Sequence, residues 1–157
     1  MAHLVFQTAF PGDLFLSIPL IKRLRAFDPG TPIVLACRPG LGEFFVTNGL
    51  VDEVLEIDKK KSGGRGAALK RLFSEEWDLV VCPHMSVRTA LWMRRVRARR
   101  GRVGFKTWWN APFFDRRVVK PMHLPDALRQ LSLLAPVDAR VAESFATEEV
   151  QALVNPE

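Results

Sequence analysis

A turn near the start of the chain contains an aspartate in a position suited to acid–base chemistry. The run AFPGD, which ends at Asp13, lies between two apolar stretches, so Asp13 is expected where a helix begins. A carboxylate there can cap the helix, and the helix dipole favours its negative charge by about 0.3–1 kcal/mol. The same group could also act as a general base toward a nearby hydroxyl. The two roles are compatible, and the sequence leaves both open.

The glycine of this turn limits which ligands we expect. A dinucleotide fingerprint needs three glycines at fixed spacing, whereas this turn has Gly12 alone. A standard NAD or FAD site is therefore not predicted. Gly12 can still let the backbone approach a ligand closely.

Two other stretches contain side chains that could bind an anion. One is PHMSVR, which follows an apolar run, and the other is the basic, glycine-containing segment 58–66. The candidate binding residues in these stretches are Lys59, Lys61, Arg65, His84, Ser86 and Arg88. A lone histidine is often structural, so His84 retains both interpretations.

The charge of the chain indicates an anionic partner. The 157 residues have a net charge of +6, and no acidic residue lies between Leu79 and Phe114. Such a field attracts nucleic acid, anionic lipid or phosphorylated glycan. Nucleic acid is the least favoured of these, because the tryptophans are clustered and no recognised motif is present. The arginines of segment 94–100 could form a solvated helix end or contact lipid head groups.

Aromatic and cysteine residues allow further predictions. The segment KTWWNAPFF, residues 106–114, could pack on the domain itself or on a missing partner domain, or it could enter a membrane interface. Cys37 and Cys82 each end an apolar run and are expected to be buried thiols. No metal-ligand spacing is present, so no metal site is predicted.

Short apolar runs alternate with helical patterns along the chain. Strands are expected at 3–7, 33–37, 54–57, 79–82, 102–105 and 118–119, and helices at 14–27, 41–48, 67–76, 87–96 and 123–134. This alternation predicts an α/β fold with a doubly wound, Rossmann-like parallel sheet. Residues 1–136 are expected to form this domain, and 137–157 a linker or the start of another domain.

Sheet topology predicts where the candidate residues meet. In a doubly wound sheet, ligands bind beyond the carboxyl ends of the strands, where the strand order reverses. The first and fourth strands flank that point, so Asp13 should face His84, Ser86 and Arg88 across one crevice. The basic segment after the third strand lies on the same edge. A carboxylate among cations suits an anionic acceptor that carries a reactive hydroxyl.

Several segments, in order, resemble the lipopolysaccharide heptosyltransferases of glycosyltransferase family 9. The matching stretches are HLVFQTAFPGDLFLSIPLIKRLR, VDEVLEID, WDLVVCPHMSVRTAL, RVGF and the helix expected from His123. Together they cover nearly all of residues 3–135. The resemblance implies the N-terminal, acceptor-side half of a GT-B fold.

The resemblance also implies roles for particular residues. Asp13 would be the base in an inverting, metal-independent transfer from ADP-heptose to the growing lipopolysaccharide core. Pro11 and Gly12 would approach the donor phosphates, and the basic candidates above would contact the acceptor. The nucleotide sugar is a substrate, so no cofactor is implied. We expect no donor-binding second domain within these 157 residues, and these residues alone are not expected to transfer sugar.

A location and an alternative function follow from the same observations. No apolar run is long enough to span a bilayer, and no signal-peptide pattern is present. We therefore expect a cytoplasmic protein, with peripheral contact at the inner face of the cytoplasmic membrane, where a lipid-anchored glycan acceptor would lie. The alternative is a non-catalytic module that binds an anionic glycan or lipid.

Overall fold

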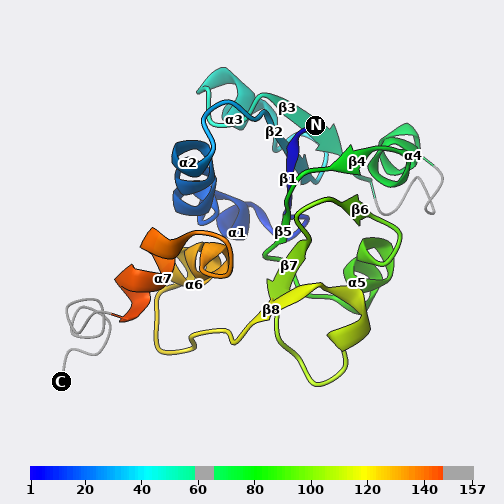
Figure 1. Ribbon diagram of the computed structural model, residues 1–157. Helices are drawn as coiled ribbons and strands as arrows, with labels where there is room; N and C mark the ends of the chain where they lie inside the picture. Colours follow the sequence, from blue (N-terminus) through cyan, green and yellow to red (C-terminus); the bar gives the residue numbers. More distant parts are fainter. Residues whose placement is uncertain (59–65, 147–157) are drawn as a thin grey trace.

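The computed structural model describes residues 1–58 and 66–146. At its centre is a six-stranded sheet in the order β3-β2-β1-β5-β7-β8 (Figure 1). These strands are β1 (His3–Phe6), β2 (Ile33–Cys37), β3 (Glu53–Glu56), β5 (Val80–Cys82), β7 (Arg102–Phe105) and β8 (Arg116–Val118). All neighbouring pairs are parallel, and the order reverses between β1 and β5. The predicted doubly wound, Rossmann-like α/β fold is confirmed.

Alternating side chains explain why helices cover both faces of the sheet. Along β1, Leu4 and Phe6 belong to one apolar cluster, whereas Val5 belongs to another. In β2, Ile33 and Val34 are divided in the same way. Successive side chains of a strand point to opposite faces, so each face has its own core and each core needs a helical layer.

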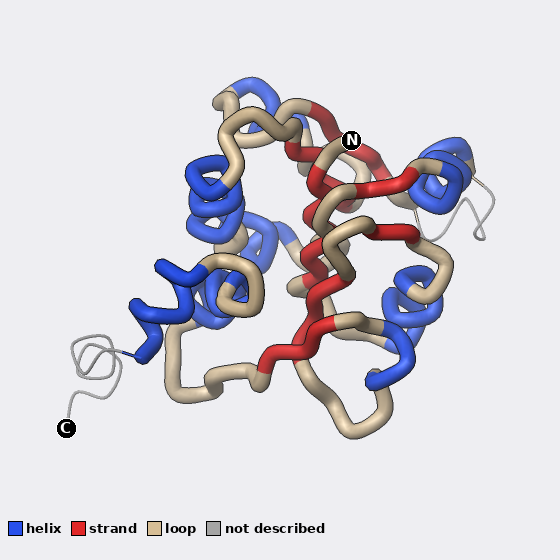
Figure 2. The backbone as a smooth tube through the Cα atoms, in the orientation of Figure 1, coloured by secondary structure: helices blue, strands red, loops and turns tan. Residues whose placement is uncertain are grey.

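The helices form these two layers. The face toward which Val5 points is covered by α1 (Pro11–Phe15), α2 (Ile18–Phe27), α3 (Glu43–Thr47), α6 (Asp126–Leu131), the 3₁₀ turn η2 (Ser132–Leu134) and α7 (Ala139–Ala146). The opposite face is covered by α4 (Ala67–Ser74) and α5 (Val87–Met93). Figures 1 and 2 show α2, α6 and α7 on one side of the strands and α4 and α5 on the other.

The first predicted helix is in fact two helices. Helix α1 begins at Pro11. Proline is favoured in the first turn of a helix because its φ is already helical and because an N–H there would have no hydrogen-bond partner within the helix. Phe10 is therefore the N-cap, and Asp13 lies within the first turn. The interpretation of Asp13 as the helix cap is wrong, because α1 begins before it.

The helices predicted at 67–76 and 87–96 both end early, and a short strand follows each of them. The strands β4 (Glu76–Trp77) and β6 (Arg97–Ala98) make a separate two-stranded parallel sheet. The buried Trp77 indole N–H donates to the Leu72 carbonyl at 3.0 Å. The Arg97 guanidinium donates to the Ser74 carbonyl at 2.6 Å. These bonds satisfy carbonyl oxygens near the end of α4, so the helix stops there.

The last helices also differ from expectation. His123 is exposed in a turn and does not lead α6, which begins at Asp126. Residues 139–146, expected to be a linker or part of another domain, form α7. Val141 is buried in the core, and Arg23 donates to the Asp138 carboxylate at 2.6 Å. These contacts join α7 to the sheet domain.

A glycine and two cysteines complete the core. A Cβ at Gly104 would lie 2.6 Å from the ring of Phe114, so the RVGF stretch needs glycine there for Phe114 to cover β7. Cys37 and Cys82 are both buried, as predicted. Burial raises the pKa of the Cys37 thiol to about 12.

Within the two described ranges, no helix has the length and apolar character needed to cross a membrane.

Candidate functional site

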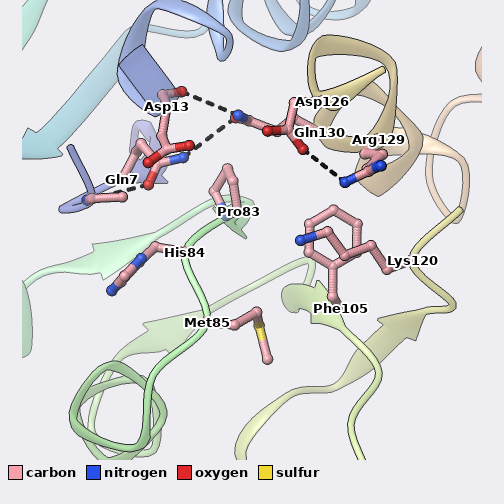
Figure 3. A pocket seen from close by; sticks show the side chains of 11 residues that line it. Gln7, Asp13, Pro83, His84, Met85, Phe105, Lys120, Asp126, Arg129 and Gln130 are labelled. Carbon is pink, nitrogen blue, oxygen red and sulfur yellow. Dashed lines mark hydrogen bonds and ion pairs between the residues drawn. The ribbon is translucent and has the colours of Figure 1, made fainter. Parts of the chain in front are cut away.

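A pocket of about 210 Å³ opens at the carboxyl ends of β1 and β5, where the strand order reverses (Figure 3). Its lining consists of Gln7, Ala9, Asp13, Pro83, His84, Met85, Phe105, Lys120, Asp126, Arg129 and Gln130. The loop after β1 therefore meets the loop after β5, and Asp13 and His84 line the same cavity. This is the position at which doubly wound sheets bind their ligands.

The backbone of Asp13 is fixed, whereas its carboxylate is not. Its carbonyl oxygen accepts a hydrogen bond from the Gln130 amide at 3.1 Å (Figure 3). It accepts another from the Ser17 hydroxyl at 3.2 Å. The half-buried carboxylate has no hydrogen bond or ion pair with any residue that the structure describes. An unpartnered carboxylate on a held turn has what a general base needs, namely a fixed position and free lone pairs.

A network of neutral side chains holds this turn. Gln7, Ser17 and Gln130 are all buried. The Gln7 amide donates to Ser17 Oγ and to Gln130 Oε1, at 3.4 Å each, and Ser17 is also hydrogen-bonded to Gln130 Oε1. Because each polar group has a partner, the network can be buried at little cost. It connects the end of β1, the junction of α1 with α2, and α6.

Two cations line the pocket, and only part of their charge is neutralised. The Arg129 guanidinium donates to Asp126 Oδ1 at 3.1 Å and to the Leu124 carbonyl at 2.6 Å. The charge of Arg129 is therefore neutralised by Asp126. The Lys120 ammonium lies 5.3 Å from the centre of the Phe105 ring. Among the described residues, Lys120 has no carboxylate partner. It is therefore the lining cation available to an anionic ligand.

Sequence reasoning missed Gln7, Lys120, Arg129 and Gln130. The clue for Lys120 was its position directly after the edge strand of the sheet, at the carboxyl edge that ligands use. Gln7 ends β1 in the same way. Gln130 gave no local signal, because its partners lie far away in sequence and near only in the fold.

The other predicted site residues have separate positions. Ser86 is the N-cap of α5: its Oγ accepts from Thr89 N–H at 3.1 Å and donates to the Thr89 hydroxyl at 2.9 Å. Arg88 is exposed on α5, and both residues lie outside the pocket lining. Pro11 and Gly12 are exposed beside Asp13 in the first turn of α1. The candidates that fall outside the described residues are Lys59, Lys61 and Arg65.

At the opposite edge of the sheet lies a charged group that we call the amino-edge cluster: His3, Asp28, Asp78 and Arg100. Arg100 Nη2 lies 2.8 Å from both Asp28 Oδ2 and Asp78 Oδ2, and His3 Nε2 lies 3.1 Å from Asp28 Oδ2. The ligand-type atoms of His3 and the two aspartates lie within 4.8 Å of one another, a spacing that could hold a metal ion. Here the Arg100 guanidinium supplies the positive charge between the two carboxylates.

Burial and hydrogen bonds shift the pKa values of three residues in the amino-edge cluster. The hydrogen bond from Arg100 holds the pKa of Asp78 below its ordinary value. Burial lowers the pKa of His3, and the nearby Asp78 partly opposes that effect. The hydroxyl of Thr31, which donates at 2.8 Å, contributes most to lowering the pKa of Asp28. The cluster is therefore built to hold ionised carboxylates around a guanidinium.

The sheet order and the pocket at its reversal point define a Rossmann-like domain. No protein-family model and no curated protein matches the sequence. Solved structures do match in fold. E. coli heptosyltransferase WaaC with ADP has a TM-score of 0.72 at 16% identity, covering 87% of this chain and 47% of that one.

Two further solved structures give the same result. The glycosyl transferase family 9 structure from Veillonella parvula DSM 2008 has a TM-score of 0.72 at 19% identity, covering 87% of this chain and 41% of that one. E. coli ADP-heptose lps heptosyltransferase II has a TM-score of 0.65 at 21% identity, covering 85% and 40%. This chain thus spans less than half the length of these proteins and shares the fold of one part of them.

Proposed function

We propose that this chain is the N-terminal, acceptor-side domain of a heptosyltransferase-like glycosyltransferase of the GT-B type, with Asp13 as the general base. The observation that carries the proposal is the Asp13 carboxylate, which has no partner among the described residues and lies on a turn held by Gln130 and Ser17, at the reversal point of the sheet. The likeness in fold to heptosyltransferases and the ordered sequence segments support it.

The proposed reaction is an inverting, metal-independent transfer. Asp13 accepts the proton of an acceptor hydroxyl as the hydroxyl oxygen attacks the anomeric carbon of the sugar. The new C–O bond forms on the face opposite the nucleotide diphosphate, whose bond to the sugar breaks and which leaves with the bonding electrons. The donor, proposed to be ADP-heptose, would be held by a second domain, with its phosphates near the exposed Pro11 and Gly12.

The acceptor is proposed to be an anionic, lipid-anchored glycan of the lipopolysaccharide core, met in the cytoplasm. Lys120 is the lining cation that can bind its anionic group, and Figure 3 shows it across the pocket from Asp13. At about 210 Å³ the cavity is smaller than the roughly 300–1,000 Å³ typical of pockets for drug-sized ligands. It would therefore enclose one sugar unit, leaving the rest of the acceptor to the basic residues predicted from the sequence.

The test uses a complete protein that contains this domain. Asp13→Asn should lower turnover by about 10²–10⁴-fold, because the transferred proton loses its acceptor. Acceptor affinity and thermal stability should remain unchanged. Glu43→Gln is a matched control, because Glu43 is also a first-turn acid of a short helix but lies outside the pocket. Normal turnover in Asp13→Asn would eliminate Asp13 as the base.

A further inference from the structure

The aromatic segment 106–114 contains both packed and unpacked rings. Phe114 is buried over Gly104, and the Trp109 ring packs edge-to-face on Phe113 with centroids 6.2 Å apart. The neighbouring Trp108 is 95% exposed. Packing on the domain itself, one of the interpretations that the sequence left open for this segment, thus applies to Trp109 and Phe114 but not to Trp108.

The exposure of Trp108 occurs on a well-held loop. Asn110 is fully buried, its amide donates to the Phe105 carbonyl at 2.6 Å, and its Oδ1 accepts from Thr107 N–H at 3.0 Å. Arg117 adds a hydrogen bond to the Thr107 carbonyl at 3.2 Å. Residues on both sides of Trp108 are therefore fixed, and the domain presents this ring to its surroundings.

The surface near Trp108 combines apolar side chains with cations. The Lys106 N–H donates to the Val118 carbonyl at 2.7 Å, which places Lys106 beside the start of segment 119–120. Val119 is 72% exposed, and Lys120 is exposed next to it. We call the group Lys106, Trp108, Val119 and Lys120 the tryptophan surface.

The acidic group that lines the pocket beside Lys120 on the Asp126 side is already neutralised. Asp126 accepts from Arg129 at 3.1 Å. Within the described ranges, Lys106 and Lys120 have no ion-pair partner. The charge left on the surface is therefore positive, which complements an anionic partner.

We propose that the tryptophan surface docks on a bilayer that contains anionic lipid, with the Trp108 ring at the level of the head groups. An indole has an apolar body and a polar N–H, which suits that zone. Each lysine close to an anionic leaflet strengthens binding by about fivefold. A single aromatic anchor with two lysines gives weak, reversible binding. The inference goes beyond the proposed function, because docking needs no sugar transfer.

The position of the surface is consistent with this partner. Trp108 follows β7, and Val119 follows β8, so both lie at the carboxyl edge of the sheet, as does the pocket. Lys120 belongs both to the pocket lining and to this surface. Docking would therefore bring the pocket close to a membrane.

The 157-residue chain itself can be tested by vesicle flotation. We expect it to float with vesicles of phosphatidylcholine mixed with phosphatidylglycerol, to be released by high salt, and not to float with phosphatidylcholine alone. Trp108→Ala should weaken partitioning by at least about tenfold, because the buried ring area is lost. Lys106→Gln should weaken it by about fivefold.

The adjacent tryptophan provides the matched control. Trp109→Ala should keep the partitioning of the wild-type chain, with circular dichroism confirming that it folds; if it does not fold, Trp109→Phe replaces it. No flotation, or equal flotation of Trp108→Ala and wild type, overturns the proposal. A change in self-association of Trp108→Ala, measured by sedimentation without any change in flotation, would make the surface a protein contact and would also overturn it.

Discussion

The two edges of the central sheet handle charge in opposite ways. At the amino edge, the carboxylates of Asp28 and Asp78 share the guanidinium of Arg100. At the carboxyl edge, Asp13 is held through its backbone carbonyl by neutral side chains, and its carboxylate has no partner within the described residues. The ion pairs of the amino edge stabilise the fold, whereas the hydrogen bonds of the carboxyl edge fix the position of Asp13 without neutralising its carboxylate.

This difference indicates which acidic residues are available for chemistry. A carboxylate that is already ion-paired, such as Asp78, would have to break that pair before it could take a proton from a ligand. Asp13 has no ion pair to break among the described residues, because its backbone carbonyl oxygen accepts the hydrogen bonds that fix its position. The amide network is therefore a means of positioning the Asp13 carboxylate without using the carboxylate oxygens as its anchor.

Acidification should produce the largest effect, because it acts on the whole amino-edge cluster. His3 has a folded pKa below its ordinary 6.5, so the unfolded chain binds the proton first, and stability falls as the pH drops below that value. The pKa values of Asp28 and Asp78 lie below 3.8, so their contribution is complete above that pH and is lost as the pH falls further. Urea unfolding at a series of pH values would show both losses.

Replacing Arg100, the cation that Asp28 and Asp78 share, tests the origin of this pH dependence. Arg100→Met should cost roughly 3 kcal/mol, because the buried Asp78 carboxylate loses its nearest cation, and the acid loss should then begin nearer pH 3.8. Arg99→Met is the control: Arg99 is 65% exposed and lies 3.3 Å from Asp78, so it should cost under about 1 kcal/mol. Equal costs for the two variants would contradict a specific role for Arg100.

Breaking the amide network at the other edge should cost less. Gln130→Met is expected to destabilise the domain by about 1–3 kcal/mol, because Ser17 and Gln7 lose a buried partner. The free energy of unfolding for Gln130→Met, Ser17→Ala and the double variant forms a cycle. A coupling of about 0.5–3 kcal/mol is expected, whereas additive costs would show that the two side chains act independently.

The smallest effect is expected at Ser86. Ser86→Ala removes the cap of α5 and should cost about 1 kcal/mol, whereas Ser86→Asn should retain most of the stability. Thermal unfolding measures both variants. If Ser86→Ala leaves stability unchanged and weakens acceptor binding in the complete protein, the side chain contacts the acceptor, as the sequence suggested, instead of serving as a cap.

The sequence predicted the sheet because its strands are short, apolar and separated by helical patterns. The same reasoning brought Asp13 and His84 to one edge, since strand order alone determines which loops meet. It was less successful at element ends. The helix expected at 14–27 starts at Pro11 and breaks near Ser17, because the side chain and backbone of that serine are used in bonds across the turn.

Side-chain partners between distant segments could not be predicted in this way. For the arginines of segment 94–100 the sequence predicts either a solvated helix end or a contact with lipid head groups. In the fold, Arg95 stacks on Phe73, with its Cζ 4.3 Å from the ring centre, and Arg100 pairs with Asp78. Composition gives the number of charges, but only the fold determines which of them neutralise one another.

The contact between Gln130 and Asp13 has a consequence for how the domain is made. It joins positions 117 residues apart. During synthesis, the strands and the first helices can assemble while the turn that holds Asp13 still lacks its clamp. That clamp arrives only when α6 emerges from the ribosome, so the geometry of the Asp13 turn would be among the last features of this domain to form.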